Sequence, residues 1–495
     1  MSIPAVPTPA GPTPAGPIPT GDPLLWPVTP LQAGLAALES LAGDATRDGY
    51  LGQSVIEVTG LLQTERLIEA IGDLIVEQPQ LHAGILIEPG DGSSTAVDPV
   101  QFIDVETAPR VAVHSDDGPA APRVAEVLQQ QRGLDWRLDQ PPLIRWDAVV
   151  GSDCAYLVVA AHHAVLDGWS MPLLVRELGR HYARRIGADG MGPAPLRGRY
   201  QDHLSWLGTR DVAAADAFWA AHLDHLDAGP PPWLRPSPDD HGVAEQARVE
   251  LPAPAPARLA AHGLTPAALA RTAWQLALDA VAGTPRTPYA MTVSTRDPEV
   301  PYAEELIGLL TDAVLVADDC APGQPMLPAA AAGERRWRQS APHRHVGLRG
   351  CYRALRSGEI ATSLLTVESA AAADPVTAGP VRFALRSVKD ATHFPVAATV
   401  RTAQDGWQVE VTADARVTAG TAERLAHAFA GFLGAAGHDR PVASADVLTA
   451  ADAERLAAAQ SNPGAPGAHP RLPDVFAATA AELGDRRALV ADGRT

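Results

Sequence analysis

The stretch AYLVVAAHHAVLDGW, residues 155–169, decides the fold of this chain. Its first seven residues form an apolar run with aromatic and β-branched members, which predicts a largely buried strand. Beyond it, Ser170 suits a helix N-cap and Pro172 a first helical turn, and apolar residues recur at helical spacing up to Tyr182. The sequence therefore predicts a strand, a tight turn and a helix, and the turn carries two histidines, an acid and a glycine.

The two adjacent histidines of the turn, His162 and His163, face opposite sides where the chain is extended. We therefore expect one of them to act on a substrate and the other to pack. Imidazole titrates near neutral pH, so it can accept a proton from an attacking group or keep that proton in position through a hydrogen bond. Asp167 can fix the loop through a charged partner, and Gly168 permits close backbone approach, with its N–H toward a developing oxyanion. The turn is a candidate site for handling a proton.

Five further segments accompany this turn along the chain. They are PVTPLQAGL at 27–35, QPPLIR at 140–145, YQDHLSW at 200–206, IGLLTD at 307–312 and THFP at 392–395. Together with the HHxxxDG turn they resemble the condensation domains of nonribosomal peptide synthetases, from about residue 23 to residue 437. The HHxxxDG signature is shared with epimerisation domains and, more loosely, with chloramphenicol acetyltransferase. Collinear matches over this length are more specific than any one motif.

The resemblance implies a mixed α/β (α+β) fold. It consists of two chloramphenicol-acetyltransferase-like lobes, arranged as a V-shaped pseudo-dimer around a central tunnel. The lobes are expected over 23–209 and 210–438, with a loop around residues 342–369 crossing back to close the tunnel. At 495 residues the chain exceeds one ordinary core, so two lobes are also expected from its length alone.

The two ends of the chain differ in composition from its middle. Residues 1–22 are rich in Pro, Ala, Gly and Thr, which predicts an extended tail or linker. Residues 439–470 are expected to form a linker that contains a short helix at Ala450–Gln460. Residues 471–495 resemble the truncated start of an adenylation domain and stop before any nucleotide-binding motif.

Charge and cysteine content exclude several kinds of partner. A formal charge of −19 without a basic stripe argues against nucleic acid. Cys154, Cys320 and Cys351 are widely separated and lack metal or disulfide spacing, which favours a reduced, cytoplasmic setting.

His343 and His345 have no carboxylate or cysteine cluster nearby in sequence, so we expect no metal site. No apolar stretch reaches the roughly 20 residues that span a bilayer, so no membrane partner is expected.

The resemblance also implies a reaction. The amine of an acceptor aminoacyl thioester attacks the carbonyl of a donor acyl or peptidyl thioester, and an amide bond forms. Partner carrier domains bring both substrates on 4'-phosphopantetheine arms, so this chain binds no cofactor itself, and an adenylation domain follows in the full synthetase. Within the signature His162, His163, Asp167 and Gly168, we expect His163 to act, either by taking the amine proton or by hydrogen-bonding the amine into attack geometry.

Other residues are expected to support the turn. The resemblance implies that Asp167 pairs with an arginine, for which Arg296 in the segment VSTR is the candidate; the alternative is an exposed Arg296. Trp169 continues the signature as DGWSMPLL. Several positions depart from the family. His82 replaces an arginine, although a neutral imidazole cannot replace a permanent, forked cation. Asp312 replaces an asparagine, Leu315 stands where proline is usual, and Ser369 replaces the asparagine of a common Glu-Asn pair.

Three functions stay open from the sequence. Peptide-bond formation is favoured by the intact HHxxxDG signature and its continuation. An epimerisation domain usually continues as DGVSWR and is followed by a different C-terminal organisation. A catalytically silent module that recruits a partner enzyme carries a damaged signature, whereas both histidines, the acid and the glycine are present here. Within the first function, the TPLQ opening and the DGWSMPLL continuation favour a donor that ends in a D-residue.

Overall fold

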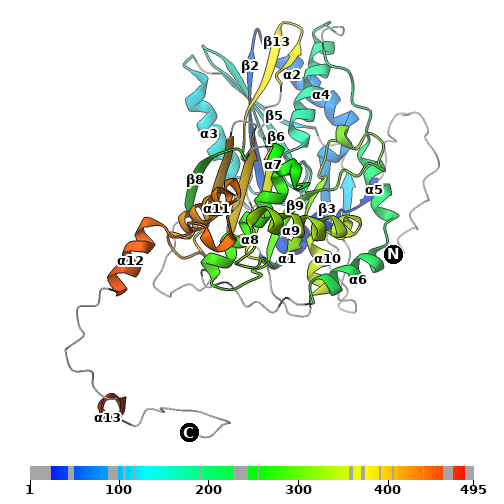
Figure 1. Ribbon diagram of the computed structural model, residues 1–495. Coiled ribbons are helices and arrows are strands. Elements are labelled where there is room, and N and C mark those ends of the chain that lie inside the picture. The colour runs from blue at the N-terminus through cyan, green and yellow to red at the C-terminus, as the bar shows by residue number, and fades with distance from the viewer. Residues whose placement is uncertain are drawn as a thin grey trace.

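The computed structural model shows a mixed α/β fold. The residues it describes are 24–42, 50–86, 99–103, 108–115, 117–188, 192–224, 226, 231, 233, 244–254, 256–355, 361–369, 374–389, 392–403, 406–438, 440–460 and 472–484. They form two six-stranded mixed sheets and one three-stranded sheet, with helices packed against them (Figure 1). The fold class expected from the sequence is confirmed.

The first six-stranded sheet carries the histidine turn. Its strand order is β12 (Val376–Ala378), β13 (Val381–Lys389), β2 (Leu51–Thr59), β7 (Ala155–His162), β6 (Ile144–Val150) and β5 (Arg110–Ser115). Neighbouring strands are antiparallel except β5 and β6, which are parallel. We call this sheet and the helices packed on it the N-terminal lobe.

Both faces of the N-terminal sheet are covered, which explains why β7 is apolar on both sides. Its helices are α2 (Thr64–Glu77), α3 (Ala120–Arg132) and α4 (Ser170–Arg185). Leu157 and Val159 of β7 pack in the core with α2 and α4, whereas Val158 packs in a separate cluster with α3. Figure 1 shows α3 on one side of this sheet and α2 and α4 on the other. A strand buried on both faces needs a continuous apolar run rather than alternation.

The second six-stranded sheet, with its helices, forms the C-terminal lobe. Its strand order is β10 (Thr311–Val316), β9 (Tyr289–Ser294), β11 (Ser363–Ser369), β14 (Val396–Thr402), β15 (Gly406–Ala413) and β8 (Glu245–Pro252). The largest core cluster joins one face to α8 (Pro266–Ala282), α9 (Met326–Ser340) and α11 (Thr421–Gly437). A smaller cluster joins the other face to α6 (Val212–His222) and α10 (Gly347–Ala354).

The chain crosses between the two lobes after β11, which differs from the sequence expectation. The expected crossing lies around residues 342–369, but that segment contributes α10 and β11 to the C-terminal lobe. Instead β12 and β13 extend the N-terminal sheet, and β13 pairs with β2. Phe383 of β13 packs edge-on against Tyr182 of α4, with ring centroids 5.6 Å apart. Residues 376–389 therefore belong structurally to the N-terminal lobe, although they lie in the second half of the chain.

The remaining elements complete the two lobes and the C-terminal segment. They are the small sheet of β1 (Leu24–Pro27), β4 (Val100–Ile103) and β3 (Ala83–Leu86), the helices α1 (Pro30–Ala42), α5 (Tyr200–Gly208), α7 (Pro256–Ala261), α12 (Ala450–Gln460) and α13 (Leu472–Leu483), and the 3-10 helices Pro79–His82, Ala303–Glu305, Ala341–Val346 and Val442–Ser444. The helix expected at Ala450–Gln460 is confirmed with the same bounds. The tail expected over 1–22 lies outside the described residues, as do 461–471 and 485–495.

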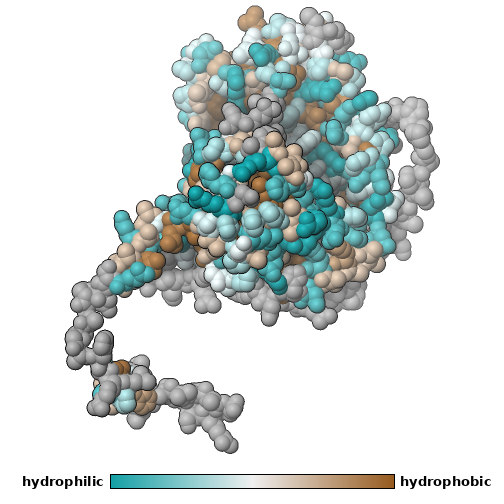
Figure 2. Space-filling view, in the orientation of Figure 1, coloured by the Kyte–Doolittle hydropathy of each residue, from teal (hydrophilic) through white to brown (hydrophobic). Residues whose placement is uncertain are grey.

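The surface and the helices show where apolar residues are placed. The face drawn in Figure 2 is mainly hydrophilic, with hydrophobic residues scattered over the two lobes and on α12. Among the described residues, no helix has both the length and the apolar character that a membrane crossing requires.

Candidate active site

The histidine turn is held by backbone hydrogen bonds to two neighbouring segments. The strand β7 ends at His162 and α4 begins at Ser170, close to the predicted bounds. The predicted N-cap is wrong, because Trp169 is the cap residue and the Ser170 hydroxyl instead bonds to Gly308. The N–H of His162 donates to the carbonyl of Leu143 at 2.8 Å, and the N–H of His163 donates to the carbonyl of Tyr50 at 2.8 Å. Main-chain hydrogen bonds alone therefore fix the backbone positions of both histidines.

His162 is a packed residue in a neutral state. It is 4 % exposed, and its Nδ1 accepts the N–H of Ala164 at 3.0 Å. Burial, followed by the nearby charge of His163, lowers the pKa of His162 to about 3. His163, in contrast, is only partly buried. The structure thus separates the two rings in the way that their opposite orientation suggests, and His163 is the one that solvent reaches.

Asp167 and Arg296 form a buried, forked ion pair. Nη1 of Arg296 lies 3.0 Å from Oδ2 of Asp167, and Nη2 lies 3.3 Å from Oδ1. The side chains are 3 % and 2 % exposed, which excludes the alternative of an exposed Arg296. The carboxylate also accepts the N–H of Ser170 at 2.8 Å and that of Leu310 at 2.9 Å. Asp167 therefore ties the turn to the start of α4 and to both ends of the segment that connects β9 to β10.

Ser170 and Gly308 are support residues to which the sequence analysis assigned no such role. The Ser170 hydroxyl donates to the Gly308 carbonyl at 2.9 Å and accepts from Nη2 of Arg296 at 2.9 Å. Gly308 has a φ of +147°, and a Cβ there would lie 2.6 Å from the ring of Tyr200, so only glycine fits. A signal exists in the sequence, because Gly308 lies in the IGLLTD segment and Ser170 is the predicted helix start.

Gln32 is a second missed support residue, at the front of the turn. Its Nε2 donates to the carbonyl of Ala164 at 2.7 Å and to Oε1 of Gln101 at 3.0 Å, and the residue is 1 % exposed. Its Oε1 accepts the N–H of Thr29 at 2.8 Å. The glutamine of the PVTPLQAGL segment therefore anchors α1 to the histidine turn.

The other residues selected from the sequence lie around this core. Gly168 and Trp169 are exposed, and the guanidinium of Arg296 lies over the Trp169 ring at 5.6 Å from its centroid. Trp169 thus covers the outer side of the ion pair and is 56 % exposed. His82 is 2 % exposed at the end of the 3-10 helix Pro79–His82. The cation beside Asp167 is Arg296, and the role of His82 stays a prediction.

Comparison with known proteins identifies the family. A family model described as the condensation domain matches residues 25–455. The chain belongs to the condensation-domain family. Its curated relatives include chondramide synthase cmdD of Chondromyces crocatus, 26 % identical over 52 % of this chain, and nonribosomal peptide synthetase 6 of Alternaria brassicicola, 27 % identical over 69 %. This condensation domain spans 7 % and 22 % of the lengths of those two proteins.

Solved structures show the same fold as this condensation domain. The first condensation domain of the calcium-dependent antibiotic synthetase, in complex with a substrate analogue, aligns with a TM-score of 0.66 at 18 % identity, covering 86 % of this chain and 99 % of that one. The X-domain from teicoplanin biosynthesis aligns with a TM-score of 0.69 at 20 % identity, covering 88 % and 100 %. At sequence identities this low, the structural similarity establishes a shared fold only.

Asp312, at the second position of β10, is a buried acid that backbone N–H groups of β10, α10 and α1 surround. It is 4 % exposed, and Oδ1 accepts the N–H of Ala313 at 2.7 Å and that of Leu348 in α10 at 3.2 Å. Burial raises the pKa of Asp312 to about 7, against the lowering effect of backbone donors, which include the N–H of Leu31 in α1. A Cβ on Gly347 would collide with the carboxylate, so the acid requires a glycine at that position.

Replacing Asp312 with asparagine is expected to change how stability depends on pH. The folded-state pKa of Asp312 lies above its unfolded value of 3.8, so its contribution is fully present below that pH and is lost as the pH rises through about 7. The advantage of the natural protein over Asp312→Asn should shrink by at most about 1.4 kcal/mol per pH unit across this window. Urea unfolding of both proteins between about pH 5 and about pH 8 measures the difference.

Buried histidines do not disturb this comparison. Burial lowers the pKa values of His162, His203 and His393, and all three occur in both proteins, so their effects cancel in the difference. Parallel stability curves for the two proteins would show that Asp312 does not titrate in this range.

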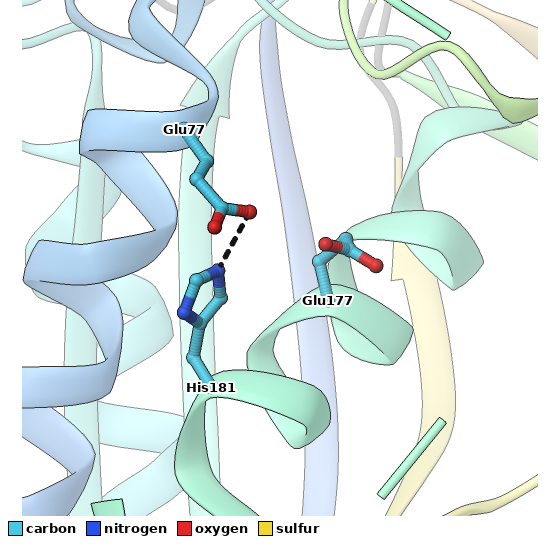
Figure 3. Close-up of side chains that lie close together, drawn as sticks. All are labelled: Glu77, Glu177 and His181. Carbon is cyan, nitrogen blue, oxygen red and sulfur yellow. Dashed lines mark ion pairs between the residues drawn. The ribbon is translucent and has the colours of Figure 1, made fainter. Parts of the chain in front are cut away.

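One cluster in the described part has the residue types of a metal site. Glu77 of α2 and Glu177 and His181 of α4 offer ligand atoms within 4.8 Å of one another, and Figure 3 shows the His181 ring facing Glu77. However, Nη2 of Arg180 lies 2.8 Å from both Glu177 Oε2 and His181 Nε2, and it also pairs with Glu77. A guanidinium therefore already occupies the position a metal ion would take, and the cluster joins α2 to α4 by charge pairing.

Proposed function

We propose that this condensation domain forms an amide bond between two thioester substrates. The observation that carries the proposal is the difference between the two histidines of the turn. His162 is buried and neutral, whereas His163 is partly exposed. Hydrogen bonds from the segments of Leu143, Tyr50, Gln32 and Gly308 hold the turn in place. The intact signature and the buried pair of Asp167 with Arg296 support an active catalyst.

The proposed reaction balances without a cofactor in this chain. The acceptor amine nitrogen forms a bond to the donor carbonyl carbon, the bond from that carbon to sulfur breaks, and the amine proton passes to the departing thiolate. His163 takes that proton in transit or hydrogen-bonds the amine into line. Holding the two thioesters about 3–3.5 Å apart removes most of the entropic cost of a bimolecular step. Donor and acceptor carrier domains, each with a phosphopantetheine arm, are the proposed partners.

The cellular setting is part of the same proposal. Cys154, Cys320 and Cys351 are all free thiols, which fits work in the reducing cytosol. An adenylation domain following in the full synthetase would load the acceptor carrier.

A transfer assay tests this function. A donor carrier loaded with a peptidyl group and an acceptor carrier loaded with an aminoacyl group are mixed with the protein, and the acceptor is followed by intact mass. The expected result is a gain of the donor mass on the acceptor carrier that depends on the protein. Donors that differ only in the configuration of their last residue test the proposed preference for a D-residue.

Two other outcomes point to the alternative functions. Inversion of the donor's last residue without transfer would indicate an epimerisation domain. No chemistry with any donor, together with binding to a tailoring enzyme, would indicate a recruiting module; one solved structural neighbour, the teicoplanin X-domain, forms a complex with OxyB.

A further inference from the structure

Tyr50 lies directly against the histidine turn, although neither the signature nor the other segments include it. It precedes β2, whose first residue, Leu51, pairs with His162 at the end of β7. Its carbonyl accepts the N–H of His163 at 2.8 Å. The backbone of Tyr50 is therefore fixed to the residue that we expect to act.

The ring of Tyr50 lies near two imidazoles, one from the turn and one from the segment that connects β13 to β14. Its centroid is 5.9 Å from that of His162 and 5.5 Å from that of His393, which lies between β13 and β14. Burial lowers the pKa of His162 to about 3, and burial together with Arg416 lowers the pKa of His393 to about 4, so both rings are neutral at physiological pH. The tyrosine thus marks the place where the two lobes meet beside the turn.

The hydroxyl of Tyr50 is a buried donor without an acceptor. Tyr50 is 8 % exposed, and its hydroxyl oxygen has no hydrogen-bond partner among the described residues. Burial raises its pKa above the usual value, so the hydroxyl keeps its proton. Nδ1 of the neighbouring His162 ring already accepts from Ala164. An unsatisfied buried hydroxyl is costly, and its place beside a catalytic turn calls for a ligand.

We propose that the Tyr50 hydroxyl is a further catalytic residue, which donates a hydrogen bond to the carbonyl oxygen of the donor thioester. This inference rests on the proposed amide-forming function. As the amine attacks, the electron pair of the C=O bond moves onto this oxygen, and it returns when the bond from carbon to sulfur breaks. Tyr50 keeps its proton throughout. A fixed donor aimed at a developing oxyanion strengthens its bond in the transition state, which raises the rate.

The substrate would reach this hydroxyl between the lobes. His393 comes from the C-terminal half of the chain, and its carbonyl accepts from Nη2 of Arg416 at 2.6 Å. His393 packs near the Tyr50 ring, so the thioester is proposed to enter beside this pair of rings. The acceptor that the buried hydroxyl lacks is then supplied by the substrate.

The test replaces Tyr50 with phenylalanine in the full chain. With saturating carriers, Tyr50→Phe is expected to lower kcat by about 10²–10³-fold, as loss of an oxyanion donor does, with little change in KM. Its stability to urea should be equal to or above that of the natural protein, because an unsatisfied polar group is removed. A purely structural role would not lower kcat while stability is kept.

Tyr182→Phe is the matched control. Its hydroxyl accepts the N–H of Gln63 at 2.9 Å, near the end of α4 that lies opposite the turn, so this variant should lose stability and keep the transfer rate. If Tyr50→Phe transfers at the natural rate, the hydroxyl is only a packing feature and the proposal is overturned.

A binding measurement separates this inference from the proposed function. If the natural protein transfers no donor, an acyl-pantetheine thioester is titrated into it and into Tyr50→Phe. Weaker binding to the variant by about 2- to 10-fold supports the contact in a protein that does not catalyse transfer. In a protein that transfers no donor, equal binding to both proteins overturns the contact.

Discussion

Replacing Arg296 with alanine is expected to lower the free energy of unfolding by about 3–5 kcal/mol, because it leaves the Asp167 carboxylate buried without its cation. Solvent weakens the interaction within this pair very little, because the side chains of Arg296 and Asp167 are 3 % and 2 % exposed. The same change removes the donor from Arg296 to the Ser170 hydroxyl and to the Leu306 carbonyl at 3.1 Å. Urea unfolding measures the loss, and the transfer rate should fall as the turn loosens.

Arg66→Ala is the matched control for this prediction. Arg66 pairs with Glu69 at 2.8 Å on the surface of α2, with side chains 47 % and 39 % exposed. Its removal should change the free energy of unfolding by less than about 0.5 kcal/mol. Arg296→Lys keeps the charge without the fork, so its stability should fall between those of the natural protein and Arg296→Ala. Equal effects of Arg66→Ala and Arg296→Ala would contradict a structural role for the buried pair.

The local structure of the turn could be predicted because it depends on neighbouring residues. An apolar run and helical spacing suffice to place β7 and α4, although the cap residue is Trp169 rather than Ser170, and local sequence also places the helix at Ala450–Gln460. Arg296 lies 129 positions from Asp167 in the chain, and only the resemblance of its segment to the family predicts that the two residues pair. No local pattern connects an acid to a partner at that separation.

The parts that could not be predicted depend on contacts between distant segments. Nothing in the local sequence of β13 shows that this strand, which follows the C-terminal strand β11 in the chain, pairs with β2 of the N-terminal lobe. Gln32 reaches Ala164 across 132 positions, and Ser170 reaches Gly308 across 138. These residues are polar and buried, and a sequence alone does not reveal which buried acceptors they will satisfy.

Replacing His163 with alanine is expected to reduce the rate of donor transfer by about 10²–10⁴-fold, which is the usual contribution of a general acid or base. Stability should change little, since the His163 side chain is only partly buried and its backbone N–H still donates to Tyr50. Intact-mass kinetics on the loaded acceptor carrier measure the rate. Transfer at the natural rate would remove His163 from the mechanism.

His162→Ala should show the opposite balance. It leaves the N–H of Ala164 without its acceptor, which costs about 1–3 kcal/mol of stability and adds a cavity beside Tyr50. Its effect on the rate should follow the loosening of the turn rather than the loss of a reacting group. The two adjacent histidines can therefore be separated by comparing rate with stability in each variant.

The chemical role of His163 is decided by His163→Gln. The glutamine carbonyl accepts a hydrogen bond from an amine but cannot take up a proton. If the transfer rate of His163→Gln is close to that of the natural protein, His163 acts by holding the amine in line, and proximity supplies most of the rate enhancement. If His163→Gln is as slow as His163→Ala, proton transfer is the role that matters.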